Sequence, residues 1–488
     1  MARLYDLLGE QHYLREGIVC GRRALALRNR ATAPEKWAAD QNNLGAYLGR
    51  LGERTGVVSY FDEAISALTQ ALEEGSEEKS FLSYARKKMN LGAAYFARGR
   101  RETGDSDLKE AARVFDEITV PKLREFNPHL YAALQSNRGS LFASLAQREI
   151  GVENLNKSLA ALTEALDIRK KDTSPFGWAI AKVNHCSALI AFGERTGEVS
   201  LYQAAIDEAK DALQIIKRIH NPRIWSMAQA NLGGAQVVVG LATRNENILK
   251  DAISNLKSSL QVLQRDDDPV LWRKIQHNLG RAYAFLGEML DDVKLLRSAL
   301  PPLQEALHDV ANSSDRRDRF LLLNEYGLAL SKLGIFSPSY LDEAETVFSD
   351  LSQELNQVSM PFEWARATLN LGHIRRDKGV ETNDVSKIQQ SIATLQDCLS
   401  VKPFTENRAF SAALNFSLAK SYLAEAQVEI DQSRALRDQL NPCRRHCHAV
   451  LKVLLNEPGN QLVADVGAIL QRVEELETIR EDTAVLGR

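Results

Sequence analysis

The chain lacks several features that mark well-known classes of protein. Its 488 residues include only five cysteines, an odd number too small for a disulfide framework, so a reducing compartment and a cytoplasmic location are expected. No apolar run approaches the ~20 residues that cross a bilayer. The first residues also lack the apolar segment of a signal peptide. We therefore expect a protein that neither enters nor spans a membrane.

The sequence also has little net charge. Lys and Arg number 61 and Asp and Glu number 64, which leaves a net charge of −3. A nearly neutral chain has no global basic field, so nucleic acid is not the expected partner. Hydrophobic residues make up 44% and charged residues 26%, a composition typical of a folded protein rather than a disordered one.

The motifs of common catalytic sites are missing too. The sequence contains no GxSxG, no Walker A motif, no HExxH and no GxGxxG in a strand–helix context. The acidic run 266–268 precedes Pro269 in an expected loop, and we interpret it as a solvated helix cap rather than a metal site. We expect no enzymatic activity and no cofactor.

What the chain does have is an internal repeat of 47 residues. In each copy an aromatic residue is followed eight positions later by a small one, as Trp37 is by Gly45. Proline lies three residues before most of these aromatics, as Pro34 does, at a place where helices begin. A second pattern follows, as at 60–74, with apolar residues at helical spacing. We expect the aromatics to pack between successive helices. They are Trp37, Tyr84, Tyr131, Trp178, Trp225, Trp272 and, after a two-residue deletion, Trp364.

The repeat predicts an all-α fold, a right-handed α-solenoid of about nine helical hairpins with a C-terminal capping helix. We expect a partial repeat over 1–30, the superhelical array over 31–432 and capping helices over 433–488. The amphipathic pattern at 461–481 predicts the cap that the open end of a solenoid requires. The alternative for this last helix is a role in dimerisation.

The repeat resembles the tetratricopeptide repeat. Leu44 and Gly45 match the Leu–Gly pair of its first helix, Tyr95 matches the aromatic that follows, and Ala64 matches the small residue of its second helix. The period here is 47 rather than ~34 residues, and the extra length contains GERTG, at 52–56 in the first copy. This period resembles the long-repeat branch that often precedes a caspase-like (CHAT) protease domain. No segment outside the repeats is long enough to be that protease.

An asparagine recurs in the first helix, two residues before the small residue. Asparagine forms helices poorly, so its recurrence inside a helix requires a reason. The position resembles the asparagine ladder of the O-linked N-acetylglucosamine transferase and kinesin light chain families, which implies a concave groove that binds an extended backbone. One amide can donate to a peptide carbonyl and accept from a peptide N–H. The alternative is hydrogen bonding between adjacent first helices, and both can hold. The series is Asn43, Asn90, Asn137, Asn184, Asn231, Asn278, Asn370 and Asn415.

Basic residues share the expected face of the first helices with the asparagines. Positions four residues before and three residues after each asparagine lie on its side of the helix. Four of these positions hold Arg86, Lys274, Arg281 and Arg366. We interpret them as specificity residues for an acidic ligand, and the alternative is solvated helix charge.

Two further polar clusters stand out. Cys443, His446 and Cys447 share a helix face at i, i+3 and i+4 and are suitable zinc ligands. No second cluster pairs with them, so we regard them as a weak metal candidate and expect an ordinary helix. We interpret GERTG as a structural turn between helices, from which Arg54 and Arg195 reach neighbouring carboxylates.

Together these patterns predict a non-catalytic scaffold or adaptor that binds an extended or acidic segment of another protein in a concave groove. Rigid repeats present a large surface at little ordering cost, which favours this function. One alternative is a regulator that senses a peptide or small ligand by tightening its superhelix. Another is an accessory or inhibitory subunit of a separately encoded enzyme, such as a caspase-like protease. The oligomeric state is left open.

Overall fold

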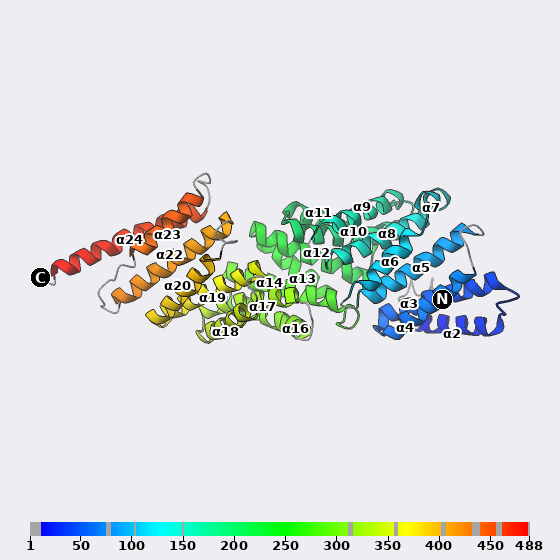
Figure 1. Ribbon diagram of the computed structural model, residues 1–488, viewed down its shortest axis with the longest axis horizontal. Coiled ribbons are helices and arrows are strands. Elements are labelled where there is room, and N and C mark those ends of the chain that lie inside the picture. The colour runs from blue at the N-terminus through cyan, green and yellow to red at the C-terminus, as the bar shows by residue number, and fades with distance from the viewer. Residues whose placement is uncertain are drawn as a thin grey trace. The chain divides into compact units, whose positions relative to one another are not determined.

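The structure is a computed structural model that describes residues 11–74, 80–101, 104–148, 151–310, 316–355, 360–401, 407–431, 440–454 and 461–486. Over these residues every regular element is an α-helix (Figure 1), so the predicted all-α solenoid of helical hairpins is confirmed. The chain divides into two compact units, unit 1 (Met1–Met289) and unit 2 (Leu290–Arg488).

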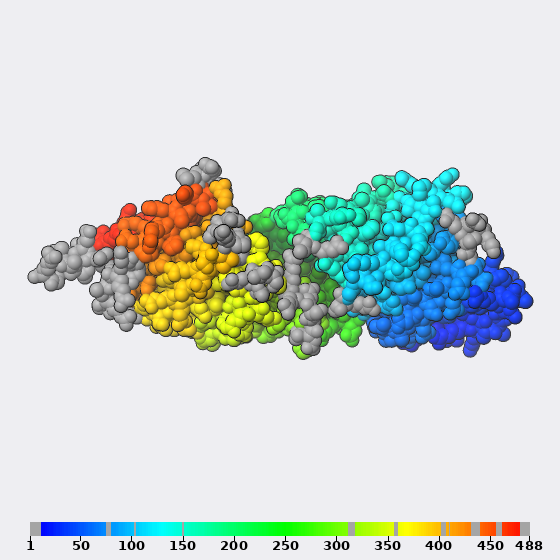
Figure 2. All heavy atoms as spheres, in the orientation of Figure 1, coloured from blue at the N-terminus to red at the C-terminus, as the bar shows by residue number. Residues whose placement is uncertain are grey.

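Unit 1 is a stack of helical hairpins, each made of a first and a second helix. In Figure 2 the atoms of its successive repeats adjoin in chain order, from blue to green. The first helices are α3 (Pro34–Thr55), α5 (Phe81–Gly99), α8 (Pro128–Ala146), α10 (Pro175–Thr196), α12 (Pro222–Thr243) and α14 (Pro269–Leu290). The second helices are α2 (Gln11–Leu27), α4 (Val58–Glu73), α6 (Ser106–Asp116) with the short α7 (Val120–Phe126), α9 (Glu153–Ile168), α11 (Val199–Ile215) and α13 (Glu246–Leu260). The first helices α3, α5, α8, α10 and α12 each pack against the second helix that follows.

Unit 2 continues the hairpins and ends in two further helices. The helix predicted at 461–481 is present as α24, and its apolar face packs against α22 and α23 through Val466 and Val473, both fully buried. Among the described helices of the chain, none is both long and apolar enough to cross a membrane. The helices of unit 2 are α15 (Val293–Ser298), α16 (Leu300–Val310), α17 (Arg316–Gly334), α18 (Ser339–Glu354), α19 (Pro361–Glu381), α20 (Val385–Leu399), α22 (Arg408–Asp431), α23 (Leu440–Val453) and α24 (Gln461–Leu486).

The GERTG sequences form the last turn of a helix and its cap. Glu53 to Thr55 lie within α3, and Gly56 follows with a φ of 74°, donating its N–H to the carbonyl of Gly52. Gly197 ends α10 in the same way, with a φ of 76°. Glycine adopts this left-handed conformation without the strain that a Cβ atom imposes. The predicted structural turn is therefore a left-handed helix C-cap.

The repeated aromatic residues are less uniformly buried than predicted. Tyr131 is 2% and Trp364 is 7% exposed, whereas the tryptophans of α3, α10, α12 and α14 are only half-buried. In unit 1 a cation seven residues earlier lies over the ring, as Arg30 does over Trp37 at 4.7 Å. The other such pairs are Arg124–Tyr131, Lys171–Trp178, Arg218–Trp225 and Arg265–Trp272. The aromatics therefore also hold the loops that precede their helices.

The small residue after each asparagine allows the two helices of a hairpin to approach closely. A Cβ atom at Gly45 would lie 2.5 Å from Cγ of Leu68 and 3.1 Å from the carbonyl oxygen of Ala64, both on α4. We expect Gly45→Ala to destabilise unit 1 by about 1–3 kcal/mol, because an added methyl group overpacks this contact. The measurement is the change in denaturant midpoint at an unchanged slope.

Gly49, one turn later in α3, provides the matched control. A Cβ atom there would meet only Cβ of Ala64, at 4.0 Å, which is ordinary contact. Gly49→Ala should therefore be neutral or stabilising by up to about 1 kcal/mol, because alanine is the better helix former. Equal effects of the two substitutions would show that the close approach at Gly45 does not control stability.

Candidate functional site

In unit 1, two of the predicted ladder asparagines join neighbouring first helices. Asn90 of α5 donates from Nδ2 to Oδ1 of Asn42 on α3, at 3.0 Å. Asn231 of α12 donates to the carbonyl of Val183 at 3.2 Å and to Oγ of Ser187 at 2.7 Å, both on α10. These amides fix how one repeat stacks on the next.

In unit 2 the ladder asparagines are bonded as well. Asn370 of α19 donates from Nδ2 to Oδ1 of Asn324 on α17, at 2.9 Å. Asn415 of α22 donates to the carbonyl of Ser411, and its Oδ1 lies 2.8 Å from Nδ1 of His446 on α23. The alternative of bonding between adjacent first helices therefore applies to Asn370, whereas Asn415 bonds its own helix and the helix that follows it.

The other four ladder asparagines differ from these. Within the described residues, their side-chain amides make no hydrogen bond, and they lie on α3, α8, α10 and α14 of unit 1. The first of them is exposed and the rest are half-buried. They are Asn43, Asn137, Asn184 and Asn278. Four donor and acceptor pairs thus remain open along the first helices of unit 1.

The predicted specificity residues fall into two groups. Lys274 and Arg281 lie on α14, one turn to either side of Asn278, whereas Arg86 on α5 and Arg366 on α19 are exposed and lie apart from them in the chain. Nζ of Lys274 is 3.9 Å from Oε2 of Glu194, and both side chains are about half exposed. The structure therefore places two of the four predicted cations beside an open amide.

His277 lies between these two cations, and its pKa is lowered. Burial, and then the charges of Arg281 and Lys274, lower the pKa of His277 to about 3. Within the described residues its Nε2 is buried without a hydrogen-bond partner. The imidazole is therefore neutral near pH 7 and does not bind an anion by charge.

The lowered pKa of His277 predicts how stability depends on pH. Below about pH 6.5 the imidazole of His277 is protonated in the unfolded chain, whereas in the folded chain it stays neutral down to about pH 3. The contribution of His277 to stability should therefore be complete above pH 6.5 and fall below it, by at most about 1.4 kcal/mol per pH unit. Urea unfolding between pH 7 and 4 measures this dependence. His277→Leu should remove its share of this slope and leave that of His373, whose pKa burial also lowers to about 3. An unchanged slope in that variant would exclude His277 as a cause.

A series of turn arginines binds each repeat to the one before it. Arg148 donates to the carbonyls of Gly99 and Gly104, and Arg195 donates to those of Ala146 and Gly151. These carbonyl oxygens are the ones that the helix C-terminus of the preceding repeat leaves unpaired, and a carboxylate partner of Arg195 stays a prediction. The series recurs every 47 residues, at Arg54, Arg101, Arg148 and Arg195, a signal that the sequence does contain.

Arg54, the first of the series, does bind a carboxylate, as predicted. Its Nη1 donates to Oδ1 of Asp267 at 2.9 Å, and Nη2 of Arg100 donates to Oδ2 of Asp268 at 2.8 Å. Asp268 accepts the N–H of Leu271 at the start of α14, so it is the predicted helix cap. The prediction that this acidic run is solvated is wrong for Asp268, whose residue is 7% exposed.

The structure separates the weak metal candidate into two parts. Cys443 and Cys447 are fully buried in the apolar cluster between α22, α23 and α24. His446 stacks on the ring of Tyr422, with ring centroids 5.8 Å apart, and bonds Asn415 of α22. Across the described residues, no three side chains of His, Cys, Asp or Glu gather as a metal ion requires.

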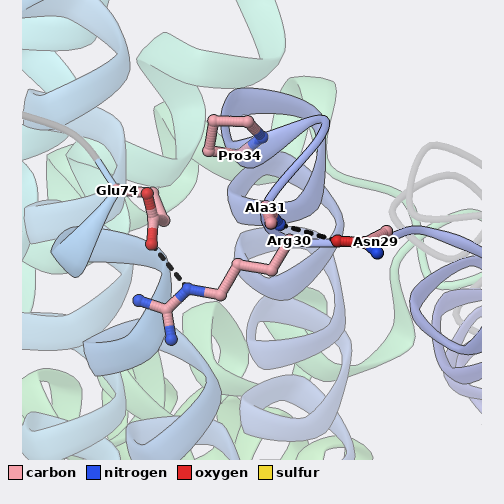
Figure 3. Close-up of a pocket in the computed structure, with 5 residues that line it drawn as sticks. All are labelled: Asn29, Arg30, Ala31, Pro34 and Glu74. Atoms are coloured by element: carbon pink, nitrogen blue, oxygen red, sulfur yellow. Dashed lines mark hydrogen bonds and ion pairs between the residues drawn. The ribbon is translucent and has the colours of Figure 1, made fainter.

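One open depression, of about 530 Å³, lies beside the start of α3 (Figure 3). Arg30 extends along it and donates to Glu73 and Glu74 at the end of α4. The same guanidinium lies over Trp37. Because these contacts already bind the charged groups that line the depression, it is a clamp between loop and helix, and we do not assign it a ligand.

No known protein-family profile matches the sequence, and no curated protein matches it. Among solved structures, a Rap protein complexed with competence and sporulation factor is 13% identical, with a TM-score of 0.38 over 83% of this chain and 99% of that one. The P58(IPK) TPR domain is 13% identical, with a TM-score of 0.21 over 88% and 97%. The APC/C hetero-tetramer Cut9–Hcn1 is 14% identical, with a TM-score of 0.24 over 95% and 96%. Likeness at this level concerns the helical fold alone, so what this chain binds is inferred from its own contacts.

Proposed function

We propose that the chain is a non-catalytic scaffold or adaptor that binds an extended segment of another protein along the first helices of unit 1. The observation that carries this proposal is the division among the ladder asparagines. Asn90 and Asn231 are used in stacking, whereas Asn137, Asn184 and Asn278 keep open amides. Among the described residues, hydrogen bonds between neighbouring first helices therefore do not use these three amides.

The open amides suit a main chain better than a set of side chains. Each offers one acceptor and two donor hydrogens, and a peptide unit offers one donor and one acceptor in return. Because the amides recur once per repeat, they hold the backbone of a bound segment at intervals and do not select its sequence. Selectivity must then come from the residues that flank them.

We further propose that the segment is acidic where it passes α14. Lys274 and Arg281 flank Asn278 there, and Nζ of Lys274 lies 3.9 Å from Oε2 of Glu194. A carboxylate of the ligand would replace water around Lys274, whose side chain is only partly buried. The 47-residue period also leads us to propose membership of the long-repeat tetratricopeptide branch.

A display selection tests this function without a known partner. Random peptides of about 12 residues, which span roughly 40 Å when extended, are passed over the full chain. We expect enrichment of peptides that contain Asp or Glu, and no enrichment by the chain with Asn137, Asn184 and Asn278 replaced by alanine. The proposal fails if the full chain enriches nothing, or if both proteins enrich the same peptides.

A further inference from the structure

Two ion pairs in unit 1 join parts of the chain that nearest-neighbour stacking does not bring together. Arg54 and Asp267 are 213 residues apart, and Arg100 and Asp268 are 168 residues apart. In a solenoid each repeat normally contacts only its neighbours. Here the ends of the first helices α3 and α5 contact the loop that precedes α14, several repeats later. The stacking of the repeats therefore brings the loop before α14 back to the ends of α3 and α5, and we call the part of unit 1 between these contacts its first superhelical turn.

The contact is close as well as charged. A Cβ atom at Gly56 would lie 3.9 Å from the carbonyl oxygen of Asp266 and 3.1 Å from Nη1 of Arg101, so the turn after α3 lies directly against the loop. Arg101 in turn donates to the carbonyl of Glu53 at 2.9 Å, which joins the ends of α3 and α5. The two arginine-bearing turns therefore meet the loop as one surface.

The carboxylates of both ion pairs are shielded from water. The side chain of Asp268 is 8% exposed, and that of Asp267 is 15% exposed. Burial by itself would raise the pKa of Asp268, but the Arg100 guanidinium and the N–H of Leu271 hold it below its usual value. Asp268 therefore stays ionised through the neutral range. The arginine side chains are more exposed, 39% for Arg100 and 37% for Arg54, so it is the carboxylates that are shielded from water.

We propose that Arg54–Asp267 and Arg100–Asp268 form a latch that holds the first superhelical turn of unit 1 closed. The latch follows from contacts within unit 1 and stands whether or not the open asparagines bind a peptide. It is a conformational device separate from the proposed binding surface.

A distance measured inside unit 1 tests the latch. Spin labels are placed at Ser59→Cys on α4 and Ser254→Cys on α13, both exposed serines, in the full chain with the exposed Cys20 replaced by serine. The four remaining cysteines are buried. Electron–electron resonance then gives the distribution of distances between the first and fifth hairpins. A closed turn should give one narrow distribution.

Two pairs of substitutions open the latch from opposite sides. One is Arg54→Gln with Arg100→Gln. The other is Asp267→Asn with Asp268→Asn, and asparagine retains the oxygens that accept the backbone N–H groups of Gln264 and Leu271. We expect both double variants to broaden and lengthen the distribution. The fourfold variant should be no broader than either double variant, because the two sides act through the same bonds.

Arg195→Gln is the matched control, because Arg195 has the same repeat position as Arg54 but donates to carbonyl oxygens of its neighbouring repeat. It should leave the distribution unchanged. Narrow, wild-type distributions in both double variants would overturn the proposal and show that apolar packing alone closes the turn. Broadening in the arginine variant alone would also overturn it, since the carboxylates would then not be its partners.

Discussion

Replacing Asn137, Asn184 and Asn278 with alanine is expected to weaken binding of a selected peptide about 100-fold. Each amide that bonds a peptide unit contributes a net of about 1 kcal/mol. Three such contributions give about 3 kcal/mol, and every 1.4 kcal/mol is a tenfold change in Kd. The loss should appear mainly as faster dissociation, since the amides act only after the segment has docked. Fluorescence anisotropy of the labelled peptide measures the affinity.

The control for this prediction is the double variant Asn90→Ala with Asn231→Ala. These amides bond Asn42, Val183 and Ser187 on neighbouring helices, so their loss should lower stability and leave peptide affinity within about threefold. If the two groups of asparagines have these separate roles, the triple variant loses affinity and the double variant loses stability. Equal losses of affinity in the two variants would contradict it, and so would an unchanged affinity in the triple variant.

The fold could be predicted from the sequence because the signals for it are local and repeated. Pro34 begins α3, and Gly45 lies where α4 approaches most closely, as the 47-residue pattern indicates. Each of these features depends on neighbours within one hairpin. A single repeat of 47 residues therefore indicates where its helices begin and where they approach, and the further repeats show the same pattern.

The partners of individual polar side chains could not be predicted in the same way. Arg54 and Arg195 have the same repeat position and the same surrounding GERTG, yet one binds Asp267 and the other binds backbone carbonyls. Arg195 follows a complete hairpin, whereas of the repeat before Arg54 the structure describes only α2. Which carboxylate then comes within reach depends on a rotation summed over several repeats, and no single repeat specifies that sum.

The asparagines show the same limit at shorter range. Asn90 bonds the residue 48 positions earlier, Asn42, and not its counterpart Asn43, 47 positions earlier. The offset arises from the angle at which one first helix crosses the next. The sequence could therefore indicate that the asparagines lie on a common face, but not which of them stacking would use.

The largest expected loss of stability is that of Phe115→Ala, at about 3–5 kcal/mol. Phe115 of α6 is fully buried, and its ring occupies the space where a Cβ atom of Gly92 on α5 would lie. Its cluster also includes Leu134 and Leu141 of α8, so the ring joins two successive repeats. Removing the ring leaves a cavity between these two repeats. Because neighbouring repeats share their core, α5, α6 and α8 should all lose protection.

Hydrogen exchange read by mass spectrometry localises this loss along the chain. Amides of α5, α6 and α8 should exchange by opening at a free energy lowered by this amount, while those of α22 and α23 in unit 2 should keep their wild-type rates. Phe126→Ala is the matched control, because Phe126 lies in the same repeat but is 62% exposed and should cost less than about 1 kcal/mol. A loss confined to α6 would show that the repeats open one at a time. Faster exchange throughout both units would instead show that they unfold as a single cooperative body.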